Sequence, residues 1–178
     1  MPTLDITEAA FGPLIEKDGI VLVDFWAAWC GPCRSFAPVF EAASDANPEI
    51  TFAKVDTEAE RGLAGAAGIT SIPTLMIFRD GVLLYREPGA LPASALTDII
   101  DQVKALDMVA IKKEIAEGII PDPNAIDPIT GEPLRTSILH AAGVGTMETI
   151  KQYGDHYNWL YGIIKPEVRD YIQTILGE

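Results

Sequence analysis

Apolar residues along the first hundred positions fall into two kinds of segment: short continuous runs and stretches with helical spacing. Residues 20–26 are apolar almost throughout, which is typical of a central strand covered on both faces. Shorter apolar runs at 51–55, 74–78 and 82–86 predict three further strands. The turn residues at 79–81 predict that the last two strands form an antiparallel hairpin.

Segments with helical spacing separate these predicted strands. They lie at residues 8–17, from the cysteine pair to Asn47, at residues 58–67, and from Pro92 onward. Strands that alternate with helices and then end in a hairpin are typical of a layered α/β arrangement. The sequence therefore predicts an α/β fold in which helices flank a mixed central sheet.

The pattern changes near Asp107. The last helix is expected to continue through Ile111 and Ile115 and to stop at Gly118. Four prolines then fall within thirteen residues, between positions 121 and 133, which excludes a helix or a central strand there. Beyond them lie short segments with helical spacing and several aromatic residues. We therefore predict a domain at 1–107, a helix extension and proline-rich linker at 108–133, and a small all-α module at 134–178.

Net charge narrows the range of partners. The 178-residue chain carries a formal charge of −13, so neither nucleic acid nor an anionic membrane is an expected partner. The sequence contains no run of about 18 apolar residues, so no membrane span is expected. The N-terminus has neither a basic start nor an apolar signal core, which favours a cytoplasmic protein.

The chain has two cysteines, Cys30 and Cys33, with Gly31-Pro32 between them. A structural zinc ion needs four ligands, and His140 and His156 lie more than 100 residues further on, so we expect no metal site. In a reducing compartment such a pair is a redox couple instead. Since the pair lies where a strand leads into a helix, the helix N-terminus should favour the thiolate form.

Residues 1–106 resemble thioredoxin along nearly the whole length of that domain. The matching positions run from Asp24 to Cys33 and include Pro38, Lys54-Val55-Asp56, Ile72-Pro73-Thr74 and Gly89-Ala90. The resemblance implies the thioredoxin fold and a protein-disulfide reductase that needs no cofactor besides its own Cys30–Cys33 disulfide. Cys30, at the start of the helix and nearer to solvent, is expected to attack, and Cys33 to resolve the mixed disulfide.

Asp24 is a charged residue inside an apolar strand. It is either an exposed carboxylate at the strand end or a buried carboxyl group whose pKa is raised by desolvation. In thioredoxins this position takes the proton from the resolving thiol, and the position of Lys54 is its electrostatic neighbour. A solvated strand lysine is an equally good interpretation of Lys54.

A docking rim around Cys30 follows from the same resemblance. It would comprise Trp29, Gly31, Pro32, Ile72, Pro73, Gly89 and Ala90, with a cis peptide bond before Pro73 that exposes the Ile72 backbone to an extended substrate. Trp26 is expected to support the site from the core. Two positions depart from the family pattern: Ser71 replaces a common glycine, and Pro88 replaces a common aliphatic residue.

The expected partners are protein disulfides and an electron donor of the thioredoxin-reductase type. A second hypothesis is a scaffold or chaperone-like module whose tail captures a partner protein through residues 134–178. Residues 137–151 are weakly similar to one ankyrin repeat, but a single repeat cannot bury its own apolar face. A helix pair is the better interpretation, with His140 and His156 structural or exposed.

Overall fold

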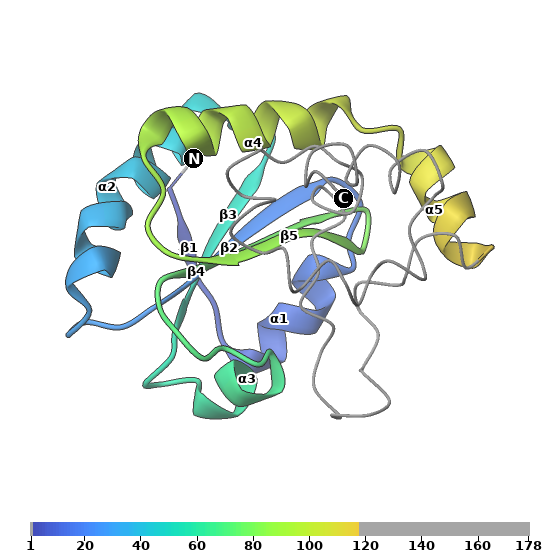
Figure 1. Cartoon of the computed structure of the whole chain (residues 1–178). Helices are drawn as coiled ribbons and strands as arrows, with labels where there is room; N and C mark the ends of the chain where they lie inside the picture. Colours follow the sequence, from blue (N-terminus) through green and yellow to red (C-terminus); the bar gives the residue numbers. More distant parts are fainter. Residues whose placement is uncertain (1, 118–178) are drawn as a thin grey trace, which may run out of the picture.

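A computed structural model of the chain describes residues 2–117, and this part contains a five-stranded sheet with the order β1-β3-β2-β4-β5 (Figure 1). β1, β3 and β2 run parallel, whereas β4 pairs antiparallel with both β2 and β5. The strands are β1 (Leu4–Asp5), β2 (Ile20–Trp26), β3 (Thr51–Asp56), β4 (Thr74–Arg79) and β5 (Val82–Pro88). The mixed sheet and the predicted hairpin are therefore confirmed.

Helices cover both faces of this sheet, as Figure 1 shows. They are α1 (Glu8–Ile15), α2 (Gly31–Ala46), α3 (Arg61–Ala66), α4 (Ala93–Ala105) and α5 (Met108–Ala116). α2 and α4 pack on one face, where Phe36, Phe40 and Leu96 are buried. α1 and α3 lie on the opposite face, where Leu63 is buried beside Val21, Val23 and Phe25 of β2.

β2 is the central strand, and its sequence explains why. Residues 21–25 are all buried, because successive side chains point alternately into the two apolar layers. Leu22 enters the layer beneath α2 and α4, and its neighbours enter the layer beneath α1 and α3. The continuous apolar run predicted this placement.

The predicted single helix beyond Pro92 is wrong. α4 ends at Ala105, Leu106 adopts an extended conformation, and α5 begins at Met108 as a separate helix. The Asp107 side chain accepts hydrogen bonds from the backbone N–H groups of Val109 and Ala110, both at 3.1 Å. An N-cap of this kind starts a new helix even where the apolar spacing runs on without a break.

Arg79 holds the junction between the two helices. Its Nη1 atom donates to the carbonyl oxygens of Val103, Lys104 and Leu106, at 2.7, 3.1 and 3.1 Å. These are the carbonyl groups that a helix C-terminus leaves without internal partners. α5 then packs Met108 and Ile111 into the layer beneath α4. The predictions for residues 118–178, including the module at 134–178, lie outside the described residues.

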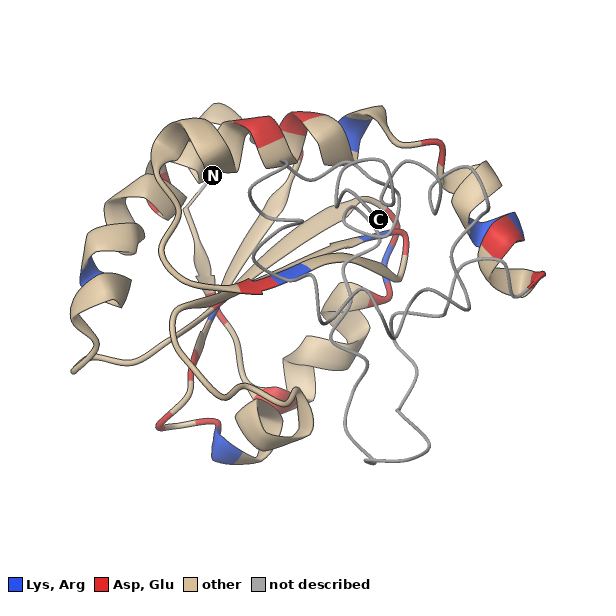
Figure 2. Ribbon diagram, viewed as in Figure 1, with Lys and Arg blue, Asp and Glu red and all other residues tan. Residues whose placement is uncertain are grey.

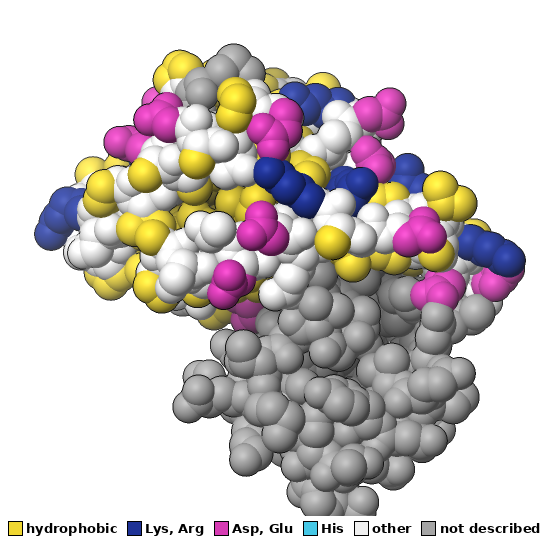
Figure 3. Space-filling model, turned by 90° about the horizontal axis from the view of Figure 1, so that it is seen from above, with side chains coloured by type: hydrophobic (Ala, Val, Ile, Leu, Met, Phe, Trp, Pro, Cys, Tyr) yellow, Lys and Arg dark blue, Asp and Glu magenta, His cyan; other side chains and the backbone are white. Residues whose placement is uncertain are grey.

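Charged groups of both signs share the surface of the described part. α4 and α5 each carry acidic and basic residues (Figure 2). Seen from above, acidic, basic and apolar side chains are interspersed, without a large patch of one sign (Figure 3). Within residues 2–117, no helix has the length and apolar character that a membrane span needs.

Candidate redox site

Cys30 and Cys33 form a disulfide where β2 leads into α2, with an S–S distance of 2.12 Å. Cys30 is the N-cap residue of α2, and its Sγ atom accepts a hydrogen bond from the backbone N–H of Cys33 at 3.2 Å. Pro32 occupies the first helical turn, where its missing N–H costs no hydrogen bond. The first sulfur therefore lies at the positive end of the helix dipole.

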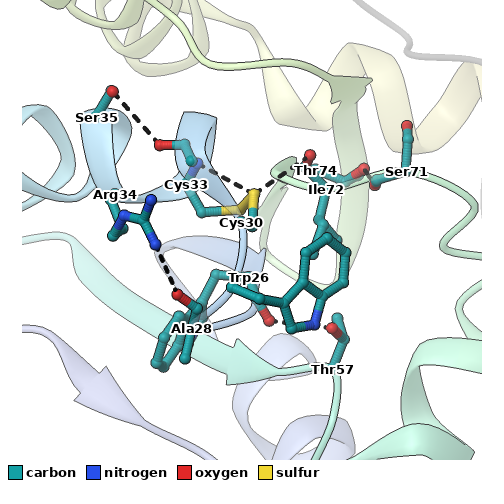
Figure 4. Close-up of a disulfide and its surroundings, with 12 residues drawn as sticks. Trp26, Ala28, Cys30, Cys33, Arg34, Ser35, Thr57, Ser71, Ile72 and Thr74 are labelled. Atoms are coloured by element: carbon teal, nitrogen blue, oxygen red, sulfur yellow. Dashed lines mark hydrogen bonds between the residues drawn. A yellow bond between two sulfur atoms is a disulfide. The ribbon is translucent and has the colours of Figure 1, made fainter.

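The exposed fraction does not distinguish the two thiols, although Cys30 was expected to be nearer to solvent. Both cysteines are 3% exposed in this disulfide state. They lie in a small apolar cluster with Ala27, against which Trp26 and Ile72 pack (Figure 4). The asymmetry of the pair therefore comes from position along α2, because Cys30 caps the helix and Cys33 lies within it.

The segment before β4 lies opposite the disulfide and has three successive carbonyl groups with different partners. The Ile72–Pro73 peptide bond is cis, as expected. The Ser71 carbonyl accepts from the Thr74 hydroxyl at 2.6 Å, and the Pro73 carbonyl accepts from the Gly89 N–H at 2.8 Å. The Ile72 carbonyl oxygen between them lies 3.7 Å from Cys30 Sγ (Figure 4). The backbone of Ile72 thus faces the sulfur that caps α2.

Asp24 is buried in the middle of β2, with 1% of its surface exposed, so it is not the exposed carboxylate of the first interpretation. Neither of its carboxyl oxygens has a hydrogen-bond partner. Burial therefore raises the pKa of Asp24 to about 7, an effect that the charge of Lys54 partly offsets. A carboxyl group with this pKa can both accept and release a proton near neutrality.

Lys54 is the residue opposite Asp24 in the β2–β3 ladder, but its ammonium group lies over an aromatic ring. Its Nζ atom is 4.8 Å from the centroid of Trp26. The charge is thus held by a cation–π contact and acts on the Asp24 carboxyl group through space, without a hydrogen bond to it. Trp26 contacts both the disulfide cluster and this lysine, which makes it part of the support of the site.

Trp29 is the exposed aromatic residue beside Cys30, with 68% of its surface accessible. Its indole N–H donates to Glu58 at 3.4 Å, and the other carboxylate oxygen of Glu58 pairs with Arg61 at 3.0 Å. Sequence reasoning missed Glu58 and Arg61, as well as the hydroxyl of Thr74. The contact of Glu58 with Trp29 joins positions 29 apart, so no local pattern indicates it. The Glu58–Arg61 and Thr74–Ser71 contacts each join residues three apart.

The remaining rim residues lie around this centre. A Cβ atom added to Gly31 would meet only the Arg34 side chain, at 3.9 Å, and one added to Gly89 would meet nothing within 4 Å. Gly89 has φ +106°, a conformation that favours glycine. Gly89 and Ala90 are both exposed. The backbone at Gly31 and Gly89 thus has room for close approach by another chain.

No group of three or more His, Cys, Asp or Glu side chains within residues 2–117 could hold a metal ion. The chemistry that the Cys30–Cys33 pair offers is the reversible reduction of its disulfide. A proton acceptor with a pKa near 7 lies on β2, the strand that leads into the pair, and the Ile72 backbone faces the sulfur.

Comparison with known proteins points to one family. The family model for thioredoxin matches residues 2–102. "Putative thioredoxin 2" of Streptomyces coelicolor is 52% identical over 115 residues, which are 65% of this chain and 86% of that protein. Thioredoxin 1 of Synechococcus elongatus is 43% identical over 99 residues, 54% of this chain and 92% of that one.

Solved structures agree with the sequence matches. Thioredoxin of Malassezia sympodialis superposes with a TM-score of 0.53 and 36% identity over 57% of this chain and 93% of its own. Thioredoxin of Plasmodium falciparum gives a TM-score of 0.53 and 33% identity over 56% of this chain and 98% of its own. The family-model match to residues 2–102 takes in all five strands, α1 to α3 and most of α4.

Proposed function

Because this chain belongs to the thioredoxin family and is a thiol-disulfide oxidoreductase, we propose that Cys30 is its attacking thiol and Cys33 its resolving thiol. The observation that carries this assignment is the position of Cys30 as the N-cap of α2. There the helix dipole and a hydrogen bond from the Cys33 N–H both favour negative charge on sulfur. Cys33 lies within the helix, where it can attack the Sγ atom of Cys30 once Cys30 is bound to a client.

The first step forms a bond between protein and substrate. In the reduced protein the Cys30 thiolate attacks one sulfur of a client disulfide, a Cys30–client disulfide forms, and the client disulfide breaks. The released client sulfur leaves as a thiolate and takes a proton from solvent. The Ile72 backbone, which faces Cys30 Sγ at 3.7 Å, lies where an extended client chain could pair with it.

The second step releases the client. Cys33 loses its proton to the ionised Asp24 carboxylate, and the resulting thiolate attacks Cys30 Sγ. The Cys30–Cys33 disulfide forms, the mixed disulfide breaks, and the second client thiolate takes up a proton. The client thereby gains two electrons and the protein loses two. Burial of Asp24 supports this role, since it raises the pKa to about 7, where the group exchanges protons readily.

The oxidised pair must be reduced again for turnover. Membership of the thioredoxin family implies protein disulfides as substrates and a reductase as electron donor. We place this cycle in the cytoplasm, because a dithiol that must be kept reduced is suited to a reducing compartment. A thioredoxin-reductase-type enzyme is the donor in this proposal.

The C-terminal extension is proposed to select partners. α5 follows α4 at the junction that Arg79 holds. Arg79 is the last residue of β4, and Thr74 is its first. Thr74 adjoins the redox loop, and Figure 1 shows α5 on the other side of the domain from the start of α2, where the disulfide lies. Residues 134–178 could then hold a partner protein beside the domain and raise its local concentration at Cys30.

Loss of the attacking thiol tests the proposed function. Cys30→Ser is expected to abolish the reduction of insulin disulfides with dithiothreitol as the reductant, because serine cannot form the mixed disulfide. The measured quantity is the rate of insulin precipitation above that of dithiothreitol alone. Turnover that persists in Cys30→Ser would rule out the assigned roles.

A further inference from the structure

Thr74 and Pro88 face each other at the end of the β4–β5 ladder nearest the disulfide. Neither side chain takes part in the sulfur chemistry or the proton transfer proposed above. Each is nevertheless linked to the segment that faces Cys30, Thr74 through its hydroxyl group and Pro88 through its neighbour Gly89. The two residues therefore adjoin the same short stretch of backbone, residues 71–73.

Thr74 fixes the start of that stretch. Its side chain is buried, with 5% of the residue exposed, and its hydroxyl donates to the Ser71 carbonyl at 2.6 Å. This bond closes a tight loop over Ser71, Ile72 and Pro73. A buried hydroxyl satisfied in this way holds a backbone carbonyl that would otherwise have to be solvated.

Pro88 fixes the other side. The Gly89 N–H donates to the Pro73 carbonyl at 2.8 Å, so Thr74 and Pro88 form a non-hydrogen-bonded pair. The nitrogen of Pro88 therefore points away from β4, and the ladder loses no hydrogen bond where proline lacks its N–H. The pyrrolidine ring also limits the backbone φ of Pro88. The next residue, Gly89, has φ +106°.

Two of the three carbonyl groups opposite the disulfide are thus held internally, and the one between them is directed at Cys30 Sγ. We propose that Thr74 and Pro88 are positioning residues that hold the Ile72 backbone in place, and thereby set the affinity of the site for extended polypeptide clients. This inference rests on the proposed function. It predicts that the pair matters for a client that docks along Ile72 and not for a small disulfide that meets only the sulfur.

The Thr74 arm of the test compares two substitutions in the full chain. Thr74→Val has nearly the same shape without the hydroxyl, and Thr74→Ser keeps the hydroxyl. Loss of one such hydrogen bond predicts that Thr74→Val raises KM for insulin about two- to ten-fold, with kcat little changed. Thr74→Ser should restore KM to within about two-fold of the wild type.

The Pro88 arm uses a matched exposed proline as its control. Pro88→Val gives the rim more backbone freedom, and the size of such proline effects predicts a KM for insulin about two- to five-fold higher. Pro48→Val removes an exposed proline from the turn after α2, and it should leave this KM unchanged. In both arms the rate of reduction of the small disulfide dithiobis(nitrobenzoic acid) should stay within two-fold of the wild type.

Different results would contradict the proposed function and the positioning role of Thr74 and Pro88. If the wild-type chain reduces neither insulin nor the small disulfide, the proposed function is wrong. The positioning role is overturned if Thr74→Val and Pro88→Val lower the unfolding temperature but leave KM for insulin unchanged. It is equally overturned if both substrates are slowed alike, or if Thr74→Ser fails to restore what Thr74→Val loses.

Discussion

A carboxyl group inside a β-sheet is costly to ionise, and Asp24 shows that cost directly. It is surrounded by buried residues of β2, and neither oxygen has a hydrogen-bond partner. Lys54 offsets the desolvation only in part, because its ammonium group lies over Trp26. The residue that we propose takes a proton from Cys33 is therefore also one that weakens the folded state when it is ionised.

The stability of the protein should depend on pH through this group. Since the pKa is raised from 3.8 to about 7 on folding, the native state keeps a proton that the unfolded chain releases. The stabilising contribution of the neutral carboxyl is complete below about pH 4 and is lost as pH rises to about 7. Relative to Asp24→Asn, the oxidised wild type should lose on the order of 4 kcal/mol over this range.

Urea unfolding of both oxidised proteins between pH 4 and pH 8 measures this difference. The amide variant carries no titrating group at position 24, so the other carboxyl groups of the chain cancel in the comparison. A difference in unfolding free energy that stays constant from pH 4 to pH 8 would show that Asp24 is ionised in the folded protein throughout.

The place of a residue could be predicted from the sequence where it depends on neighbouring positions in the chain. Burial of Asp24 follows from the apolar residues on either side of it, and the cysteine pair identifies itself by spacing. The contacts of Trp29 with Glu58, and of Lys54 with Trp26, join segments that are far apart in the chain. Side-chain pairing of this kind is decided by the packed fold, and no periodicity along the sequence encodes it.

At the scale of elements, the sheet and its flanking helices follow from periodicity, whereas the break between α4 and α5 does not. The apolar spacing continues from Val103 to Ile111, which favours one helix. The structure breaks it because the Asp107 side chain caps a new helix and Arg79 satisfies the carbonyl groups of the old one. α5 can thereby turn Met108 and Ile111 into the core.

This packing makes α5 a structural part of the described domain, which mutation can test. Ile111 is 8% exposed, so Ile111→Ala should lower the unfolding free energy by about 2–4 kcal/mol through lost burial and the cavity left behind. Val109 on the same helix is 81% exposed, and Val109→Ala should change it by less than about 0.5 kcal/mol.

Urea unfolding of the full chain reports both substitutions, and insulin reduction provides the functional readout. Both variants should keep wild-type turnover, because α5 is at the end of β4 away from the disulfide. Equal, small effects of the two substitutions would show that α5 does not pack on the domain as described.

At the scale of the whole molecule, the disulfide and α5 lie at different ends of the sheet. The disulfide lies where β2 ends and β4 begins, and the chain continues from the far end of β4 through α5. The last described helix, α5, therefore lies away from the redox site. The partner-selecting role that we propose for the extension would change which clients meet the dithiol without changing the reaction.

The central claim is that Cys30 forms a covalent bond with the client and Cys33 resolves it. Mass spectrometry of reduced Cys33→Ser mixed with a peptide disulfide measures this most directly. The account predicts one stable adduct, with the mass of one peptide half attached at Cys30 and released by dithiothreitol. Attachment at Cys33 in the complementary Cys30→Ser variant, with none at Cys30 in Cys33→Ser, would contradict it.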